Sequence, residues 1–171
     1  MTDLQELRNK AALKNSQLSR VLDEALPHFR NRLNEQQLEW CRHELHGYEP
    51  PITIYKGEAE DLSPYRLVVG AIRLAKADGS LHEIDHPIAQ QEEFFVCAPL
   101  SRLEKCCAEP GEISIVELPV LTAHLGEQMG GKIVCECDKS ELERIITGVR
   151  LNVVALLDQA MKKSGEVRTN P

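Results

Sequence analysis

The segment from Lys139 to Lys163 carries the clearest helical pattern in the chain and limits how the rest can fold. Its apolar residues recur at the spacing of one helix face: Leu142, Ile145, Ile146, Val149, Val153, Leu156, Leu157 and Ala160. Leu151 and Val154 are also apolar but fall outside this stripe. A helix that is apolar on more than one side has to be covered on more than one side. We therefore expect it to be either the centre of a single domain or a docking surface for a partner.

The composition is typical of a water-soluble globular protein and disfavours two kinds of partner. The chain has 171 residues, 42% of them hydrophobic and 27% charged, and a net charge of −7. Because an acidic chain without a basic stripe is repelled by phosphate, we expect no binding to nucleic acid or to anionic membranes. No apolar run approaches the roughly 20 residues of a membrane-spanning helix. Residues 1–6 lack the basic and apolar regions of a secretory signal, so the expected location is the cytoplasm.

A helical N-terminal segment is expected over residues 1–47. One narrow apolar stripe predicts a thin, exposed helix over residues 3–26, which Pro27 would end or kink because proline lacks the amide donor. A second helix is predicted to begin at Asn34, because Gln37 stands at the spacing of a capping box.

Residues 51–163 are expected to form an α+β domain in which short strands alternate with helices. Strand patterns occupy Ile52–Lys56, Phe94–Ala98, Glu112–Leu118 and Lys132–Cys137, and helix patterns occupy Ser101–Cys107 and Leu121–Met129. Ser101 and Glu104 have the spacing of a second capping box. About four short strands are therefore expected, and they predict a small mixed sheet packed with helices. Residues 164–171 are polar and are expected to be a flexible tail.

The segment from Ser63 to Asp78 can be interpreted in two ways. Pro64 at the first helical position and Gly79 just past the end favour a helix. The apolar run Leu67–Val69 would also suit a strand, in a hairpin that turns at Gly79. We favour the helix.

Four of the six cysteines are candidates for metal or redox chemistry. Cys106 is adjacent to Cys107, and one residue separates Cys135 from Cys137, so together they offer four thiolates to zinc. Neither pair has the C-x2–4-C spacing of structural zinc sites. In a strand Cys135 and Cys137 would face the same side, which favours buried core thiols. We assign no metal ligand, no catalytic residue and no cofactor.

No catalytic motif identifies a reaction, so the favoured function is non-catalytic. We expect a cytosolic protein-interaction module, such as an accessory factor, adaptor or small chaperone, which binds another protein or itself. The predicted interaction residues are apolar residues of the N-terminal segment and the two outside the stripe of the last helix: Leu4, Leu7, Leu18, Leu22, Leu151 and Val154.

Two alternative hypotheses remain. One is a small metal-binding or thiol-dependent protein that uses the four cysteines just named. The other is an enzyme on a mixed α/β sheet that binds a small molecule at strand ends near Tyr55, Glu58 and Asp138.

Overall fold

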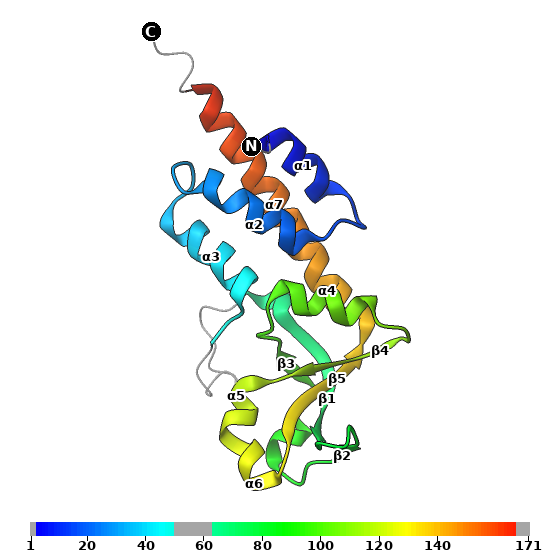
Figure 1. Cartoon of the computed structure of the whole chain (residues 1–171). Coiled ribbons are helices and arrows are strands. Elements are labelled where there is room, and N and C mark those ends of the chain that lie inside the picture. The colour runs from blue at the N-terminus through cyan, green and yellow to red at the C-terminus, as the bar shows by residue number, and fades with distance from the viewer. Residues whose placement is uncertain (1–2, 50–62, 167–171) are drawn as a thin grey trace. The chain divides into compact units, whose positions relative to one another are not determined.

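The structure is a computed structural model, which describes residues 3–49 and 63–166 (Figure 1). It has an α+β fold, as predicted, and its described strands pair antiparallel. Contacts divide the chain into two units. Unit 1 comprises residues 1–47, 99–104 and 146–171, and unit 2 comprises residues 48–98 and 105–145. The strand predicted over Ile52–Lys56 and most of the predicted tail lie outside the described residues.

Unit 1 is helical. It contains α1 (Leu4–Ala12), α2 (Leu18–Phe29), α3 (Glu35–His46), the beginning of α4 (Leu100–Ala108) and the larger part of α7 (Lys139–Glu166). Arg8 of α1 forms an ion pair with Asp158 of α7 at 3.1 Å, which places these two helices side by side. From Val149 onward, the stripe predicted for the last helix is buried in this unit, with Val149, Val153 and Leu157 fully inaccessible. The N-terminal helices thus help to cover α7.

The single helix predicted over residues 3–26 is wrong, because the structure has two helices there. The chain leaves helical geometry at Leu13, whose φ of −76° and ψ of 124° are extended, and α2 begins at Leu18. The break allows α1 to pack beside α2, which buries the apolar stripe that would otherwise be exposed. Pro27 does not end α2, which continues to Phe29.

Local capping signals have different outcomes in α3 and α4. The box predicted for α3 is confirmed, because Asn34 Oδ1 accepts from the Gln37 amide at 2.8 Å and Gln37 Oε1 accepts from the Asn34 amide at 3.1 Å. The box predicted from Ser101 and Glu104 is wrong. Helix α4 begins earlier, and the Glu104 carboxylate accepts hydrogen bonds from the N-terminus of α2 instead.

Unit 2 is built on a sheet of five strands: β1 (Leu67–Ala75), β2 (Leu81–His82), β3 (Glu93–Phe95), β4 (Ile113–Glu117) and β5 (Lys132–Asp138). The order is β2-β1-β5-β4, and β3 pairs with the beginning of β1 (Figure 1). Side chains alternate between the two sheet faces, and the buried face includes Val68, Ile72, Leu74, Ser114, Val116, Ile133, Cys135 and Cys137.

The helix predicted from Ser63 to Asp78 is wrong, and the hairpin alternative is correct. A short 3₁₀ turn over Pro64–Arg66 precedes β1, and Gly79 has a φ of 83° in the turn to β2. The proline and glycine therefore punctuate a strand rather than a helix. Pairing of Gly70–Ala75 with β5 decides the conformation, and this partner lies too far along the chain for a local pattern to indicate it.

The first turns of α7 extend the hydrogen bonding of β1 beyond the end of β5. Glu141 Oε2 accepts from the Val69 amide at 3.0 Å, and Arg144 donates to the carbonyls of Leu67 and Tyr65 at 2.5 and 3.1 Å. Asp138 caps the same helix, because its Oδ1 accepts from the Ser140 amide at 2.8 Å. These polar side chains satisfy backbone groups that a sheet edge would otherwise leave open.

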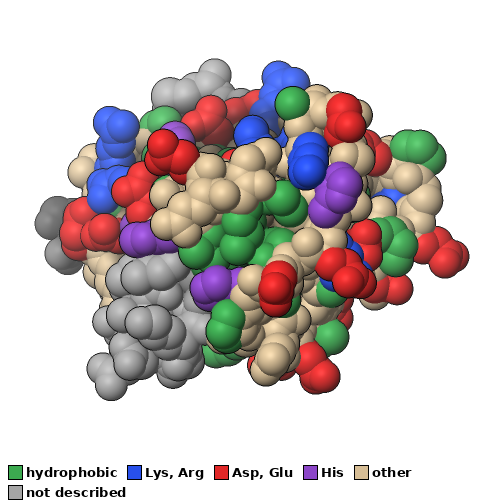
Figure 2. Space-filling model, turned by 90° about the horizontal axis from the view of Figure 1, so that it is seen from below, with side chains coloured by type: hydrophobic (Ala, Val, Ile, Leu, Met, Phe, Trp, Pro, Cys, Tyr) green, Lys and Arg blue, Asp and Glu red, His purple; other side chains and the backbone are tan. Residues whose placement is uncertain are grey.

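The remaining part of unit 2 is helical and irregular. A short run of turns, α5 (Pro119–Leu121), η4 (Thr122–Gly126) and α6 (Glu127–Met129), agrees with the helix predicted over Leu121–Met129. Figure 2 shows the face of this unit at the end where α6 and β2 lie. Hydrophobic side chains gather in a hollow at its centre, histidines lie beside it, and acidic side chains are scattered around it.

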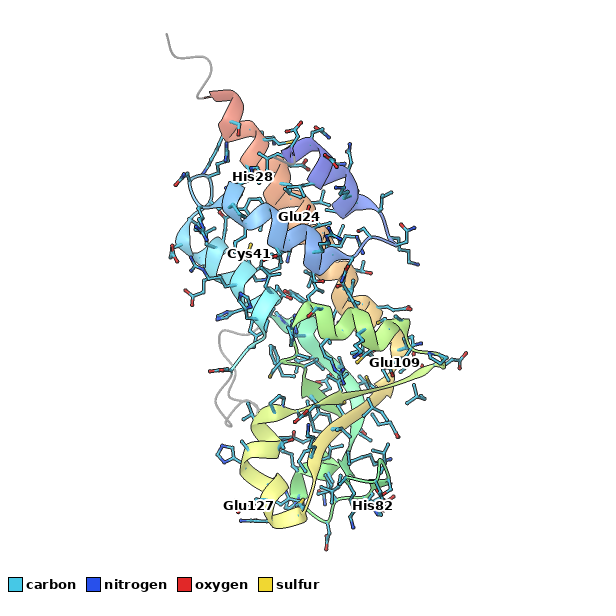
Figure 3. The ribbon with its side chains drawn as sticks, viewed as in Figure 1. Glu24, His28, Cys41, His82, Glu109 and Glu127 are labelled. Atoms are coloured by element: carbon cyan, nitrogen blue, oxygen red, sulfur yellow. The ribbon has the colours of Figure 1, made fainter. Side chains whose placement is uncertain are left out.

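One buried thiol in unit 1 makes the free energy of unfolding depend on pH in the alkaline range. Burial, helped by the charge of Glu44, raises the pKa of Cys41 on α3 (Figure 3) to about 12. An unfolded thiol ionises near pH ~8.5. Between these two pKa values the unfolded state has lost its proton and the folded state has not. The stabilisation by the protonated Cys41 thiol is fully present below the pKa of the unfolded thiol. As pH rises above that value, the free energy of unfolding falls by up to about 1.4 kcal/mol per pH unit.

We therefore expect Cys41→Ala to flatten the decline of stability above pH ~9. Urea unfolding of the wild type and the variant, each measured on both sides of that pH, compares the two slopes. Equal slopes would show that Cys41 ionises as readily in the folded chain as in the unfolded one.

Candidate interaction groove

Helices α3 and α7 border a groove of about 380 Å³ in unit 1. Its lining consists of side chains from these two helices: Gln36, Gln37 and Trp40 from α3, and Asn152, Ala155, Leu156 and Gln159 from α7. On each helix these residues are three or four positions apart or adjacent, so they share one helix face. The groove is therefore formed by two regular elements rather than by a loop.

One hydrogen bond links the two walls of the groove. Gln37 Nε2 donates to Gln159 Oε1 at 2.9 Å. The carbonyl oxygen of the same Gln37 side chain accepts from the Asn34 amide in the capping box. Both ends of the Gln37 amide are thus held, and the start of α3 is fixed against α7. The groove wall is preorganised at this point, which lowers the entropic cost of binding.

The lining chemistry suits binding rather than catalysis. Four of the seven residues carry a primary amide, which both donates and accepts hydrogen bonds, and the other three are Trp40, Ala155 and Leu156. None of the seven is a nucleophile, a general acid or a general base at neutral pH. The groove therefore offers apolar contact and neutral hydrogen bonding. Peptide groups need the same combination of donors and acceptors.

The predicted interaction residues fall into two sets. Leu4, Leu7, Leu18 and Leu22 are buried among the helices of unit 1, at most 8% exposed. Leu151 is 67% exposed on α7, and Val154 is partly exposed. Leu151 lies one helical turn before Ala155, so its side chain is next to the groove. The structure brings only Leu151 close to the groove lining.

The sequence-based prediction missed all seven lining residues. Amides and an alanine do not stand out in an apolar pattern, and Leu156 belongs to the apolar stripe that predicts the buried face of the last helix. The available signal was Trp40, the only tryptophan of the chain, beside the apolar face of a well-capped helix. Amides at helical spacing on two segments become a site only when the fold brings those segments together.

The four candidate cysteines lie in unit 2. Cys106, Cys135 and Cys137 are buried and Cys107 is partly exposed, so the expectation of buried thiols in β5 is confirmed. Within the described residues, no group of three or more His, Cys, Asp or Glu side chains is arranged to hold a metal ion. Of the residues named for the enzyme hypothesis, Tyr55 and Glu58 lie outside the described residues, and Asp138 caps α7.

A turn in unit 2 brings an aspartate, a serine and a histidine together. Ser80 Oγ lies 2.5 Å from Asp78 Oδ1 and 2.8 Å from Nε2 of His82 (Figure 3). The hydrogen bond from Ser80 lowers the pKa of the Asp78 carboxyl. In a hydrolytic triad the imidazole lies between the carboxylate and the hydroxyl, whereas here the hydroxyl lies in the middle. This arrangement stabilises the turn and does not activate the serine.

Comparison with known proteins gives no relative from which a function could be transferred. No protein-family model, no curated protein and no solved structure matches the chain. In the described part of the chain, no helix is both long enough and apolar enough to cross a membrane.

Proposed function

We propose that the chain is a non-catalytic protein-interaction module, which binds a neutral peptide segment of another protein in the groove between α3 and α7. The observation that carries this proposal is the lining of the groove, which combines four amides with apolar surface and contains no reactive or charged side chain. Amide side chains would bond to the peptide groups, and Trp40 would pack against an apolar side chain of the segment.

The surroundings of the groove support a peptide as its occupant. A segment lying along α7 would extend over Leu151, whose side chain is exposed one turn from Ala155. A single exposed leucine is common on a protein surface. A leucine at the end of a groove, however, adds apolar contact for the part of a peptide that extends beyond the groove. A volume of about 380 Å³ holds a few side chains of such a segment rather than a folded domain. An adaptor, accessory factor or small chaperone in the cytosol would use the groove in this way.

The test combines peptide selection with intrinsic fluorescence. Random peptides displayed on phage are selected on the full-length chain, and the selected peptides are titrated while the emission of Trp40 is recorded. Because Trp40 is the only tryptophan, any change in emission reports directly on the groove. We expect the selected peptides to be neutral and apolar and to shift the emission to shorter wavelength.

A matched pair of variants locates the binding site. Ala155→Arg places a long charged side chain in the groove from an exposed position, so we expect peptide affinity to fall at least about tenfold, which corresponds to roughly 1.4 kcal/mol. Ala12→Arg makes the same change at the exposed end of α1 and should leave affinity unchanged. Failure to select any peptide, or equal affinity for both variants, would contradict the proposal.

A further inference from the structure

A second binding site is indicated in unit 2, where β5 places two thiols side by side. Cys135 and Cys137 are two positions apart in the strand, so both side chains lie on the buried face of the sheet. They are 0% and 3% exposed. Strand β5 lies between β1 and β4, so each cysteine has a neighbour on both sides. Gly70 of β1 and Ser114 of β4 are the register partners of Cys137.

Gly70 leaves the space in which the two cysteines meet. A Cβ atom at this position would lie 2.8 Å from Cys135 Sγ and 3.1 Å from the Cβ of Cys137. The Glu136 carbonyl oxygen of β5 would lie nearer still, at 2.7 Å. Any other residue would therefore displace both the Cys135 thiol and the backbone of β5. The absence of a side chain at Gly70 allows Cys135 Sγ to lean toward Cys137. In agreement, the Cys135 and Cys137 side chains are hydrogen-bonded to each other.

Ser114 supplies an independent indication of a ligand. It is 4% exposed, on the same sheet face as Cys137, and its Oγ has no hydrogen-bond partner among the described residues. Buried hydroxyls normally have a partner, and one that lacks it calls for an explanation. A hydroxyl opposite a thiol can donate to the sulfur once that sulfur is a thiolate, as outer groups do around metal ligands.

The strand geometry favours a bridging ion over a disulfide. Two residues of a strand advance about 6.6 Å, and their side chains leave the sheet in parallel. A disulfide needs Cβ atoms only about 3.8 Å apart, which would require the backbone of β5 to bend. An ion with a sulfur on each side at about 2.3 Å spans about 4.6 Å between the sulfurs and requires less convergence.

We propose that Cys135 and Cys137 form a two-coordinate site for a soft monovalent metal ion of the Cu(I) class. Thiolates are the ligands that select Cu(I), and a two-sulfur site agrees with the finding that no three donors converge within the described residues. Binding replaces the two thiol protons, which are released to solvent, and no oxidation step is involved. The Ser114 hydroxyl donates a hydrogen bond to one of the bound thiolates.

Cys107 of α4 gives the ion a route of entry. This thiol is partly exposed, and it lies near enough to Cys137 for the two groups to interact electrostatically. A single thiol supplies only one of the two sulfur ligands that the ion needs, so Cys107 does not retain the ion by itself. An ion captured at Cys107 can pass to the buried pair.

The test is an anaerobic titration of the full-length chain with Cu(I) in competition with the chelator bicinchoninate. We expect one ion per chain, and X-ray absorption at the copper edge should show two sulfur ligands and no nitrogen. Cys135→Ser and Cys137→Ser should each weaken binding by more than about 100-fold, and Ser114→Ala by about tenfold. The double variant Cys106→Ser/Cys107→Ser should retain the equilibrium affinity and load more slowly.

Several results would overturn the proposal. They are complete retention of copper by the chelator, a third sulfur or a nitrogen ligand in the wild-type spectrum, or loss of binding in the Cys106→Ser/Cys107→Ser variant. Circular dichroism shows whether each cysteine variant is folded. If either single variant is not folded, the wild-type spectrum decides, together with Gly70→Ala once circular dichroism shows that this variant is folded. That variant keeps every thiol but places a methyl group against Cys135 Sγ and the Glu136 carbonyl, so affinity should fall in the folded variant.

Discussion

Arg150→Met is expected to lower the free energy of unfolding by about 3 kcal/mol, because one guanidinium closes the end of α1. Arg150 Nη1 donates to the carbonyls of Ala11 and Leu13 at 2.7 and 2.6 Å and to Ser16 Oγ at 2.8 Å. Its Nη2 donates to the Lys14 carbonyl at 3.2 Å. The last carbonyls of a helix have no partner within the helix, so this side chain from α7 satisfies them.

The charge of Arg150 is part of the expected effect. Burial lowers its pKa and the charge of Glu104 raises it, but a guanidinium stays protonated throughout the accessible pH range. Methionine keeps much of the apolar stem and removes all of these hydrogen bonds. Arg150→Lys should recover less than half of the loss, because an ammonium cannot reach several carbonyls in fixed directions.

Urea unfolding curves measure this loss, and an unchanged slope with denaturant shows that the folded state remains compact. Arg20→Met is the control. Arg20 has a 75% exposed side chain and, among the residues that the structure describes, pairs with Glu24 of its own helix, so its replacement should cost at most about 0.5 kcal/mol. A similar small loss for Arg150→Met would mean that water satisfies the end of α1 equally well.

The fold was predictable from sequence where the signal is local. The capping box of α3 was predicted correctly because Asn34 and Gln37 satisfy each other within one turn. The buried stripe of α7 was predicted because its period reflects the helix itself. Strand β1 was missed because its conformation depends on pairing with β5, and the same proline and glycine punctuate both a helix and a hairpin.

The candidate site was less predictable for the same physical reason. Apolar pattern identifies residues that need to be buried, and Leu4 and Leu7 are buried by the chain's own helices rather than by a partner. The groove depends instead on amides, whose role appears only when Gln37 and Gln159 face each other across two helices. Of the interaction residues predicted from the apolar pattern, only Leu151 is also near the groove, since it is apolar, outside the stripe and exposed.

Glu104 illustrates how a correct local spacing can serve a distant partner. Its carboxylate was expected to cap its own helix, but it lies at the N-terminus of α2. Glu104 Oε1 accepts from the Leu18 amide at 2.5 Å, and Oε2 accepts from the Ser19 hydroxyl at 2.5 Å. The Ser19 amide donates to the same carboxylate at 3.3 Å. An N-cap supplied from another helix satisfies the same free amides, and its negative charge complements the helix dipole.

Glu104→Ala is therefore expected to lower the free energy of unfolding by about 2 to 3 kcal/mol, and Glu104→Gln by about 1 to 2 kcal/mol. Glutamine keeps one acceptor but loses the charge and turns an NH₂ group toward amide donors. The loss arises partly because Ser19 is 7% exposed and would be left without its acceptor. In a double-mutant cycle, Ser19→Ala and Glu104→Ala should couple by about 1 kcal/mol, since each removes the other's partner.

Glu109→Gln provides the control for charge alone, because Glu109 is exposed just beyond the end of α4 (Figure 3). Removing this carboxylate should change stability by less than about 0.5 kcal/mol. If Glu104→Ala were equally mild, solvent would have replaced the carboxylate at the start of α2, and the buried Ser19 hydroxyl would need another acceptor. Additivity in the cycle would lead to the same conclusion, since two side chains that bond to each other cannot contribute independently to the free energy of unfolding.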